Sequence, residues 1–479
     1  MLIGDPLAAR QVLIERSGID FVKEGTAFFP GSSLAGEGLL VSDGALWQRQ
    51  RRLSTPAFRA AAVRRYSDAM LEATQDFLAE EWRCAGGAEG ARGGAFTVAS
   101  QQVRDVYGDF NVLTLDVVAR ALFGADLSAE GALIQSAVAE AFEHFATRAA
   151  SGFVVPEWAP TPSNARYATA VAQLDRVVYG LIAKRRAAIA ANGVEAAGDD
   201  LLGDLLCAVD DGDGGDGGGM GDKPLRDELM TLMVAGQETS AIVLAWACAL
   251  LSERPHMQAR IAAEVATAGG EAALCEAVEA RALPYTEAVL YECMRLRPPA
   301  YMVGRCAARD AVVETRDGRS YDVPRGTTLL VAPWLLHRDG RFWGADAHEF
   351  RPERWLGAQG EELRKSRHYL PFGAGPRGCI GARFALVEGM VVLGALCSRA
   401  RLAPAPLAPR PTPGALITLR PEGAVLLAVS PRAEEAAGVG GNVAPAARAD
   451  ADEDETASDD GSWQASAGSA TADAEVLYK

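Results

Sequence analysis

Residues 372–381, which read FGAGPRGCIG, constrain the fold more than any other stretch of the sequence. Their single cysteine, Cys379, lies in a glycine-rich loop and precedes a helical pattern over Ala382 to Leu396. Glycine lets a backbone turn and approach a flat ligand closely where a side chain would clash. The loop amides and the start of the following helix direct donors and positive dipole at the sulfur, which favours a metal-binding thiolate. The plainer interpretation is a buried cysteine in a glycine-rich turn.

This loop also matches a known signature, F-G-x-G-x-R-x-C-x-G, at every fixed place. The matching residues are Phe372, Gly373, Gly375, Arg377, Cys379 and Gly381. Here the sequence resembles the cytochrome P-450 family of haem-thiolate monooxygenases. The resemblance implies a mainly α fold with small β-sheets and a haem b whose iron is bound axially by Cys379. It also implies that Phe372, Gly373, Arg377 and Gly381 bind the cofactor.

Two further segments occur in the order that the family requires. The helical pattern LPYTEAVLYECMRLR, residues 283–297, carries Glu292 and Arg295 at i and i+3, on one face. The segment FRPERW, residues 350–355, resembles the family's P-E-R-F segment. The resemblance implies a buried ion network of Glu292, Arg295 and Arg354. By itself, an E-x-x-R pair is usually a solvated surface pair.

A long apolar helical pattern over Asp227 to Glu253 is interrupted at its centre by AGQETS, residues 235–240. A helix that is apolar on all sides is expected to be buried, so a Gly and an acid–alcohol pair at its middle need a reason. In the family, A-G-x-[DE]-T-[TS] marks the helix that crosses the distal haem face. The resemblance implies that Thr239 relays protons during oxygen activation and that Glu238 supplies them from solvent. Alone, a Thr that bonds back to a carbonyl is common in buried helices.

Cationic and aromatic residues can be assigned to the haem propionates by the same resemblance. Trp47 and Arg51 match the family's W-x-x-x-R helix, and an indole N–H and a guanidinium both suit a carboxylate. Arg305 and Arg377 fall where the family has two more propionate-binding arginines. His337 is a weaker candidate for the same role.

Composition agrees with one large catalytic domain over residues 1–432. The chain has 479 residues, of which 49% are hydrophobic and 23% charged, enough for a sizeable core. The eight cysteines contain no C-x-x-C pair, which argues against zinc and disulfide frameworks and favours a reducing compartment. No glycine-rich phosphate loop indicates a flavin or nicotinamide module, so electrons are expected from a separate protein.

Charge is unevenly distributed along the chain. The net charge of −16 disfavours nucleic acid as a partner. Residues 433–479 form an acidic tail, which we expect to be disordered, and residues 210–222 form a Gly/Asp-rich flexible loop. Around the cysteine the sign reverses, which predicts a positive surface that docks an acidic electron donor, a ferredoxin or flavin reductase. The cations concerned are Arg364, Lys365, Arg367, Arg377 and Arg383.

The N-terminus departs from the family pattern. MLIGDP resembles the second strand of the family's first sheet, so the first helix and first strand are expected to be missing. Any membrane anchor or transit peptide would be missing with them, and localisation stays open between a reducing intracellular compartment, a plastid and an endoplasmic-reticulum membrane surface. Either the sequence is an incomplete gene product, or the fold tolerates an unpaired strand edge, which would favour association.

The substrate is expected to be largely apolar. By family analogy its contacts come from residues 31–40, 142–155, 234–235 and 300–303, which contain few charges. The loop Phe153–Trp158 could touch a membrane and guard an entrance. The wider pattern resembles the branch of plant and algal carotenoid-ring hydroxylases and bacterial lipid hydroxylases, which suggests a carotenoid, terpenoid or fatty acid.

The function implied is dioxygen activation at a haem held by Cys379, followed by hydroxylation of the substrate. One alternative is a haem-thiolate isomerase or dehydratase that needs no electron donor, and the intact Glu238-Thr239 pair argues against it. Another is a non-catalytic haem-binding protein or an inactive truncated product.

Overall fold

The computed structural model describes residues 1–26, 33–83, 102–151, 155–208 and 220–432. These residues are mostly helical, with small sheets, which confirms the predicted fold class. The boundary expected after residue 432 coincides with the end of a compact unit, Met1–Arg432. The predicted acidic tail and most of the predicted flexible loop lie outside the described residues.

The helices of eight residues or more are α2 (Gly44–Ser54), α3 (Ala60–Glu80), α4 (Val106–Phe123), α5 (Gly131–Ser151), α6 (Pro162–Asn192), α8 (Asp222–Ser252), α9 (Pro255–Thr267), α11 (Pro284–Leu296), α14 (Gly357–Arg364) and α15 (Ala382–Arg399). Shorter α-helices are α1 (Pro6–Arg10), α7 (Leu201–Cys207), α10 (Leu274–Glu279), α12 (Pro333–Leu336) and α13 (Gly340–Trp343). Other helical turns are η1 (Gln11–Glu15), η2 (Thr55–Phe58), η3 (Val194–Ala197), η4 (Glu271–Ala273), η5 (Pro352–Trp355) and η6 (Gly375–Arg377).

The strands form four small sheets. They are β1 (Leu2–Ile3), β2 (Phe21–Val22), β3 (Gln102–Asp105), β4 (Val303–Ala307), β5 (Ala311–Glu314), β6 (Ser320–Val323), β7 (Thr328–Val331), β8 (Ala400–Pro404), β9 (Pro413–Ala415), β10 (Leu419–Pro421) and β11 (Leu426–Pro431). The largest sheet has the order β1-β7-β4-β2, with β1 parallel to β7 and the other pairs antiparallel. Strands β3, β11 and β8 form a second, antiparallel sheet, while β5–β6 and β9–β10 form two hairpins.

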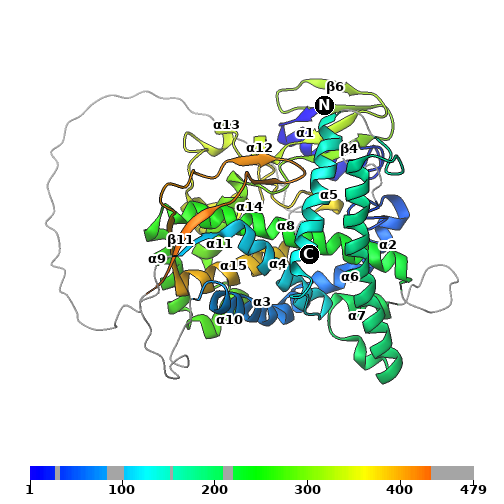
Figure 1. The fold of residues 1–479 in the computed structure, drawn as a ribbon. Coiled ribbons are helices and arrows are strands. Elements are labelled where there is room, and N and C mark those ends of the chain that lie inside the picture. Colours follow the sequence, from blue (N-terminus) through cyan, green and yellow to red (C-terminus); the bar gives the residue numbers. More distant parts are fainter. Residues whose placement is uncertain (27–32, 84–101, 152–154, 209–219, 433–479) are drawn as a thin grey trace, which may run out of the picture. The chain divides into compact units, whose positions relative to one another are not determined.

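The central helix is α8, the long apolar segment predicted from the sequence. It packs against α4, α6, α11 and α15, and in Figure 1 it passes behind α4 and α5. It is long and apolar enough to cross a membrane, yet 67% of its most apolar window is buried inside the protein. A helix that is apolar all round and surrounded by others is a core helix. It therefore positions whatever chemistry its AGQETS segment carries.

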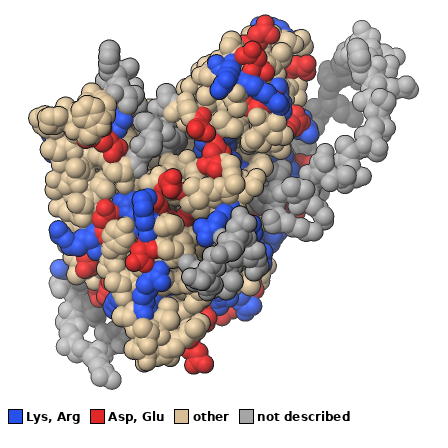
Figure 2. Space-filling model, turned by 90° about the vertical axis from the view of Figure 1, so that its right-hand side faces the viewer, with Lys and Arg blue, Asp and Glu red and all other residues tan. Residues whose placement is uncertain are grey.

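Local signals explain where neighbouring helices begin and end. The side chain of Asp105 accepts a hydrogen bond from the Tyr107 amide and caps α4, and Gly124, with φ 52°, ends that helix. Helix α11 begins with Pro284 at its first position, where a missing N–H costs nothing. Basic and acidic side chains are interspersed over the face shown in Figure 2, as is usual for a soluble surface.

A buried carboxyl joins α8 to α15, the helix that follows the cysteine loop. The Ser240 hydroxyl of α8 donates to Oε2 of Glu388, which has no exposed surface, and Oε1 of Glu388 is buried without a partner among the described residues. Burial raises the pKa of Glu388 to about 8, and the bond from Ser240 opposes that shift. The folded protein therefore keeps this carboxyl neutral at pH 7.

We expect the stability contributed by this site to decline as pH rises. Between about 4.5 and 8 the folded state holds a proton at Glu388 that the unfolded chain has released, so the free energy of unfolding falls by about 1.4 kcal/mol per pH unit. Glu388→Gln removes the titration and should gain stability relative to wild type from pH 5 to 8. Denaturant unfolding measures this, with exposed Glu361→Gln as the control. A difference that does not vary with pH would contradict the assignment.

Candidate active site

The cysteine loop is closed by its own backbone. The Cys379 amide donates to the Phe372 carbonyl at 2.8 Å, and the Gly378 amide donates to the Gly375 carbonyl at 2.9 Å. Gly375 has φ 70°, and a Cβ at that position would lie 2.2 Å from the carbonyl oxygen of Leu13 in η1. Only glycine meets both demands, so the loop is fixed against η1 by backbone packing.

Cys379 lies deep in the fold, yet its side chain keeps accessible surface. Burial raises the pKa of its thiol, while the Gly381 amide and the nearby Arg51 charge act in the opposite direction. In the described ranges, no group of three or more His, Cys, Asp or Glu could hold a metal ion. A metal bound here would therefore have Cys379 as a single protein ligand, with the other ligands supplied by a cofactor.

Four cations gather beside this loop. Arg51 donates to the Gly378 carbonyl at 3.0 Å, which ties α2 to the loop, and Arg377 donates to the Ser42 carbonyl at 2.7 Å. Arg305, on β4, is 2% exposed, and its Nε is buried without a partner among the described residues. Burial, together with the charges of Arg305 and Arg377, lowers the pKa of Lys23 to about 7.

One acid, Asp43, balances part of this charge by pairing with Arg377. Trp47 adds an aromatic surface, because the Arg377 guanidinium lies 4.1 Å from the centre of its ring. The structure thus brings together four residues predicted as propionate ligands: Trp47, Arg51, Arg305 and Arg377. Burial and the charge of Arg377 lower the pKa of Arg305 to about 10. Excess buried positive charge suits a ligand with two negative charges.

His337, the weaker candidate for that role, contacts a different part of the fold. Its Nε2 accepts a hydrogen bond from the Leu370 amide at 2.8 Å, and its ring lies 5.2 Å from the ring of Tyr369. Burial and the charges of Arg338 and Arg295 lower its pKa to about 3, so it is neutral at physiological pH. These contacts correct the propionate interpretation and favour a structural role, next to the ion network.

The predicted ion network is present in the structure. Glu292 and Arg295, both fully buried, form a two-bond pair of 2.8 and 2.9 Å, and Arg354 bonds the same carboxylate at 2.9 Å. The Trp355 indole and the Arg351 amide also donate to Glu292, each at 2.9 Å. Because one carboxylate receives this many donors, removing it would leave buried charges unpaired. The network holds η5 against α11, behind the cysteine loop.

At the middle of α8, the Thr239 hydroxyl donates back to the Ala235 carbonyl at 2.8 Å. Thr239, Ala235 and Gly236 are only partly buried, unlike most of this helix. A Cβ on Gly236 would lie 2.9 Å from Cγ2 of Val118, so the glycine permits close contact with α4. The interruption read from the sequence therefore corresponds to a small, partly accessible surface on the core helix.

Glu238, expected to supply protons from solvent, is buried in the described fold. It is 5% exposed, and its Oε1 accepts hydrogen bonds from the Tyr107 hydroxyl at 2.9 Å and the Thr418 hydroxyl at 3.3 Å. Burial raises the pKa of this carboxyl, opposed by the bond from Tyr107, the charge of Arg420 and the bond from Thr418.

Several residues of the site belong to no motif that the sequence analysis identified. Tyr107, Thr418 and Lys23 come from segments remote in sequence, and only the fold brings them here. Glu388 could have been noticed as a lone acid in an otherwise apolar helix. One other predicted feature, the loop Phe153–Trp158, is only partly described: Phe153 lies outside the described residues, whereas Trp158 is 83% exposed. Membrane contact there stays a prediction.

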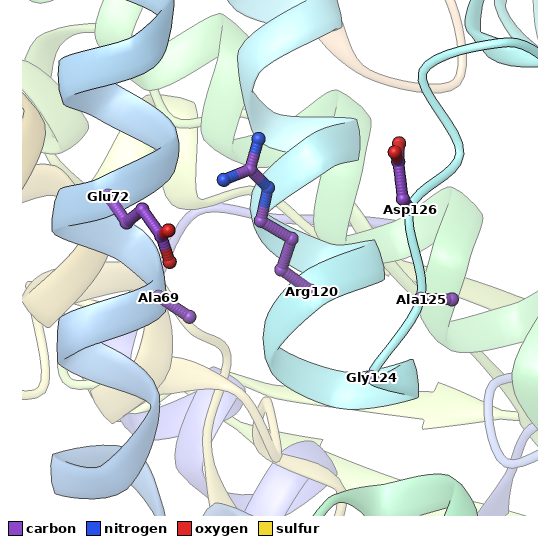
Figure 3. A pocket seen from close by; sticks show the side chains of 6 residues that line it. All are labelled: Ala69, Glu72, Arg120, Gly124, Ala125 and Asp126. Atoms are coloured by element: carbon purple, nitrogen blue, oxygen red, sulfur yellow. The ribbon is translucent and has the colours of Figure 1, made fainter.

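A separate surface hollow of about 470 Å³ opens between α3 and the end of α4 (Figure 3). Its lining residues are Ala69, Glu72, Arg120, Gly124, Ala125 and Asp126. The Arg120 guanidinium is paired with Asp116 and Asp76, so its charge is neutralised. None of the residues assigned above to the candidate site lines this hollow.

Comparison with known proteins agrees with this geometry. The family model described as Cytochrome P450 matches residues 1–428. The chain is 32% identical over 391 residues to cyclooctatin synthase of Streptomyces melanosporofaciens, covering 81% of this chain and 76% of that protein. It is 29% identical over 436 residues to LUTEIN DEFICIENT 5, chloroplastic, of Arabidopsis thaliana, covering 87% and 68%.

Solved structures give the same result. The haem domain of cytochrome P450DA superposes with a TM-score of 0.72 at 25% identity, covering 90% of this chain and 88% of that one. Together with the cysteine loop and the ion network, these matches show that the chain belongs to the cytochrome P450 family.

Proposed function

We propose that this P450 monooxygenase hydroxylates an apolar organic substrate, a terpenoid, carotenoid or fatty acid, with electrons from a separate acidic protein. The family implies haem with cysteine-thiolate ligation, and bound haem supplies dioxygen activation and oxidation of a C–H bond. The observation that carries the proposal is an accessible cysteine, Cys379, in a backbone-closed loop beside four cations.

The residues present fit a haem. Two propionates would offset the excess charge of Lys23, Arg51, Arg305 and Arg377, and would supply an acceptor for the buried Nε of Arg305. The carbonyl of Phe372 holds the Cys379 amide, and a Cβ on Gly381 would lie 4.0 Å from the Cys379 sulfur. We assign Cys379 as the axial ligand on this basis.

If Arg305 binds a propionate, Arg305→Met should lose haem faster. Losing one charge-assisted hydrogen bond predicts a release rate higher by about tenfold or more. Haem transfer to excess apomyoglobin measures this rate. The control is Arg309→Met, four residues after Arg305, which removes an arginine that is 63% exposed and pairs with Asp20. Equal release from both variants would contradict the assignment. Haem-free Arg305→Met should be no less stable than wild type, because it lacks a buried, incompletely paired charge.

The substrate proposal rests on the surface beside Thr239. Val234 and Ala235 lie on α8 within five residues of Thr239 and are partly exposed. Tyr301 and Met302, which directly precede β4, are also only partly buried. Apolar side chains with few charges favour an apolar ligand. Relatives that include cyclooctat-9-en-7-ol 5-monooxygenase and cytokinin hydroxylase agree with hydroxylation as the reaction.

We expect at least one terpenoid, carotenoid or fatty acid to shift the haem spin state and to gain one oxygen atom from dioxygen. Spectral titration followed by product analysis under labelled dioxygen measures both. Val234→Phe should weaken binding about tenfold by filling the proposed pocket, whereas Val243→Phe, further along α8, should not. Conversion without an electron donor would instead support an isomerase or dehydratase.

The electron-donor proposal is refined by the surface cations. Arg364 donates to the Trp355 carbonyl and lies 5.4 Å from the centre of the Tyr291 ring, so it packs against the protein. The side chain of Arg377 is only 7% exposed. Arg367 and Arg383, which flank the cysteine loop, are exposed and remain the best docking residues.

Reversing the charge at Arg367 and Arg383 to Glu should slow reduction by an acidic ferredoxin or flavodoxin at least about tenfold at low salt. It should also flatten the dependence of that rate on ionic strength. Stopped-flow reduction measures both. Arg319→Glu, on the β5–β6 hairpin, is the control because its side chain is 70% exposed. If the double variant is reduced as fast as wild type at every salt concentration, the docking site lies elsewhere.

A further inference from the structure

The carboxyl of Glu238 is held on one side only. Both hydroxyls that reach it, those of Tyr107 and Thr418, bond the same oxygen, Oε1. Its other oxygen, Oε2, has no hydrogen-bond partner among the described residues. Unlike the unpartnered atoms there that are fully buried, it keeps some accessible surface. The two oxygens therefore differ: one is fixed by protein donors, and the other remains accessible to water.

Tyr107 reaches Glu238 because of how α4 crosses α8. Tyr107, Thr114 and Val118 follow one another along the face of α4 that meets α8. Thr114 donates to the Gln237 carbonyl at 2.9 Å, and Val118 fills the space beside Gly236. Two fixed contacts next to Glu238 thus set where the Tyr107 hydroxyl lies.

Thr418 lies on the turn of the β9–β10 hairpin. That turn is anchored twice to the segment that follows α11. The Leu419 amide donates to the Pro299 carbonyl at 2.9 Å, and the Tyr301 hydroxyl donates to the Leu416 carbonyl at 2.7 Å. Thr418 is 9% exposed, so its hydroxyl is confined to this position.

We propose that Tyr107 and Thr418 are positioning residues that clamp Oε1 of Glu238, so that Oε2 is the atom that carries the proton. The inference rests on the proposed function, in which Glu238 is an acid. A proton leaves Oε2 for a water molecule near Thr239, and the O–H bond at Oε2 re-forms with a proton from solvent. The positive charge of Arg420, which is half-buried, favours the ionised form of Glu238 that remains after the proton has left.

The clamp has a measurable consequence. Two hydroxyl donors favour the ionised carboxyl and offset part of the effect of burial. Without the Tyr107 donor, Glu238 should hold its proton more tightly and release it less readily at neutral pH. Loss of Thr418, the longer bond, should act in the same direction with a smaller effect.

The test uses the haem-loaded protein and two readouts. Infrared difference spectra follow the C=O band of the protonated Glu238 carboxyl, which is assigned by its loss in Glu238→Gln. In Tyr107→Phe the titration midpoint of this band should move to higher pH, and in Thr418→Val it should move less. Thr418→Ser should restore it. The control is Tyr66→Phe, since the Tyr66 hydroxyl is buried without a partner among the described residues and should leave the band unchanged.

The second readout is the product formed per electron pair consumed, measured with hydrogen peroxide release. Tyr107→Phe should lower this ratio at least about threefold at neutral pH and shift its pH profile in step with the infrared midpoint. An unshifted band in both Tyr107→Phe and Thr418→Val overturns the clamp, even if Glu238→Gln is uncoupled. Full coupling in Glu238→Gln instead overturns the acid role within the proposed function, and the infrared result still decides the clamp.

Discussion

The placement of one sulfur controls the rest of this structure. Burial disfavours the thiolate of Cys379, and the Gly381 amide and the charge of Arg51 act against this effect. The free protein therefore does not stabilise the Cys379 thiolate by itself. It holds Cys379 in a rigid loop, where binding to iron would favour loss of the thiol proton. The backbone contact at Gly375 and the bond from Arg51 keep that loop in one geometry.

Buried ionisable groups without a full set of oppositely charged partners also occur around α8. Cations gather near the cysteine loop without enough acids, whereas Glu238 and Glu388 are acids buried with hydroxyl partners rather than cations. Each arrangement costs stability in the protein alone, because an incompletely paired group is desolvated. Such costs concentrate where a protein binds a ligand or moves a proton. Burial thus raises the pKa of Glu238 on the central helix, and it raises that of Glu388, which this helix contacts from α15, to about 8.

Much of this could be predicted from sequence where residues act locally. The cysteine loop, the Glu292–Arg295 pair and the acid–alcohol interruption of α8 are short patterns whose chemistry follows from spacing, and the predicted fold class is confirmed. What sequence reasoning missed depends on contacts between remote segments. Tyr107 and Thr418 meet Glu238 only through the crossing of α4 and the docking of a hairpin. The resemblance suggested His337 as a weaker candidate for binding a haem propionate. Its contacts with Leu370 and Tyr369, which no local pattern encodes, favour a structural role.

The central claim is that Cys379, as a thiolate, holds the haem iron. Absorption spectroscopy of the reduced protein under carbon monoxide tests it most directly. The account predicts the strongly red-shifted Soret band of thiolate ligation in the wild type and its absence in Cys379→Ala. A wild-type protein that binds haem without that band, or a Cys379→Ala variant that retains it, would contradict the account.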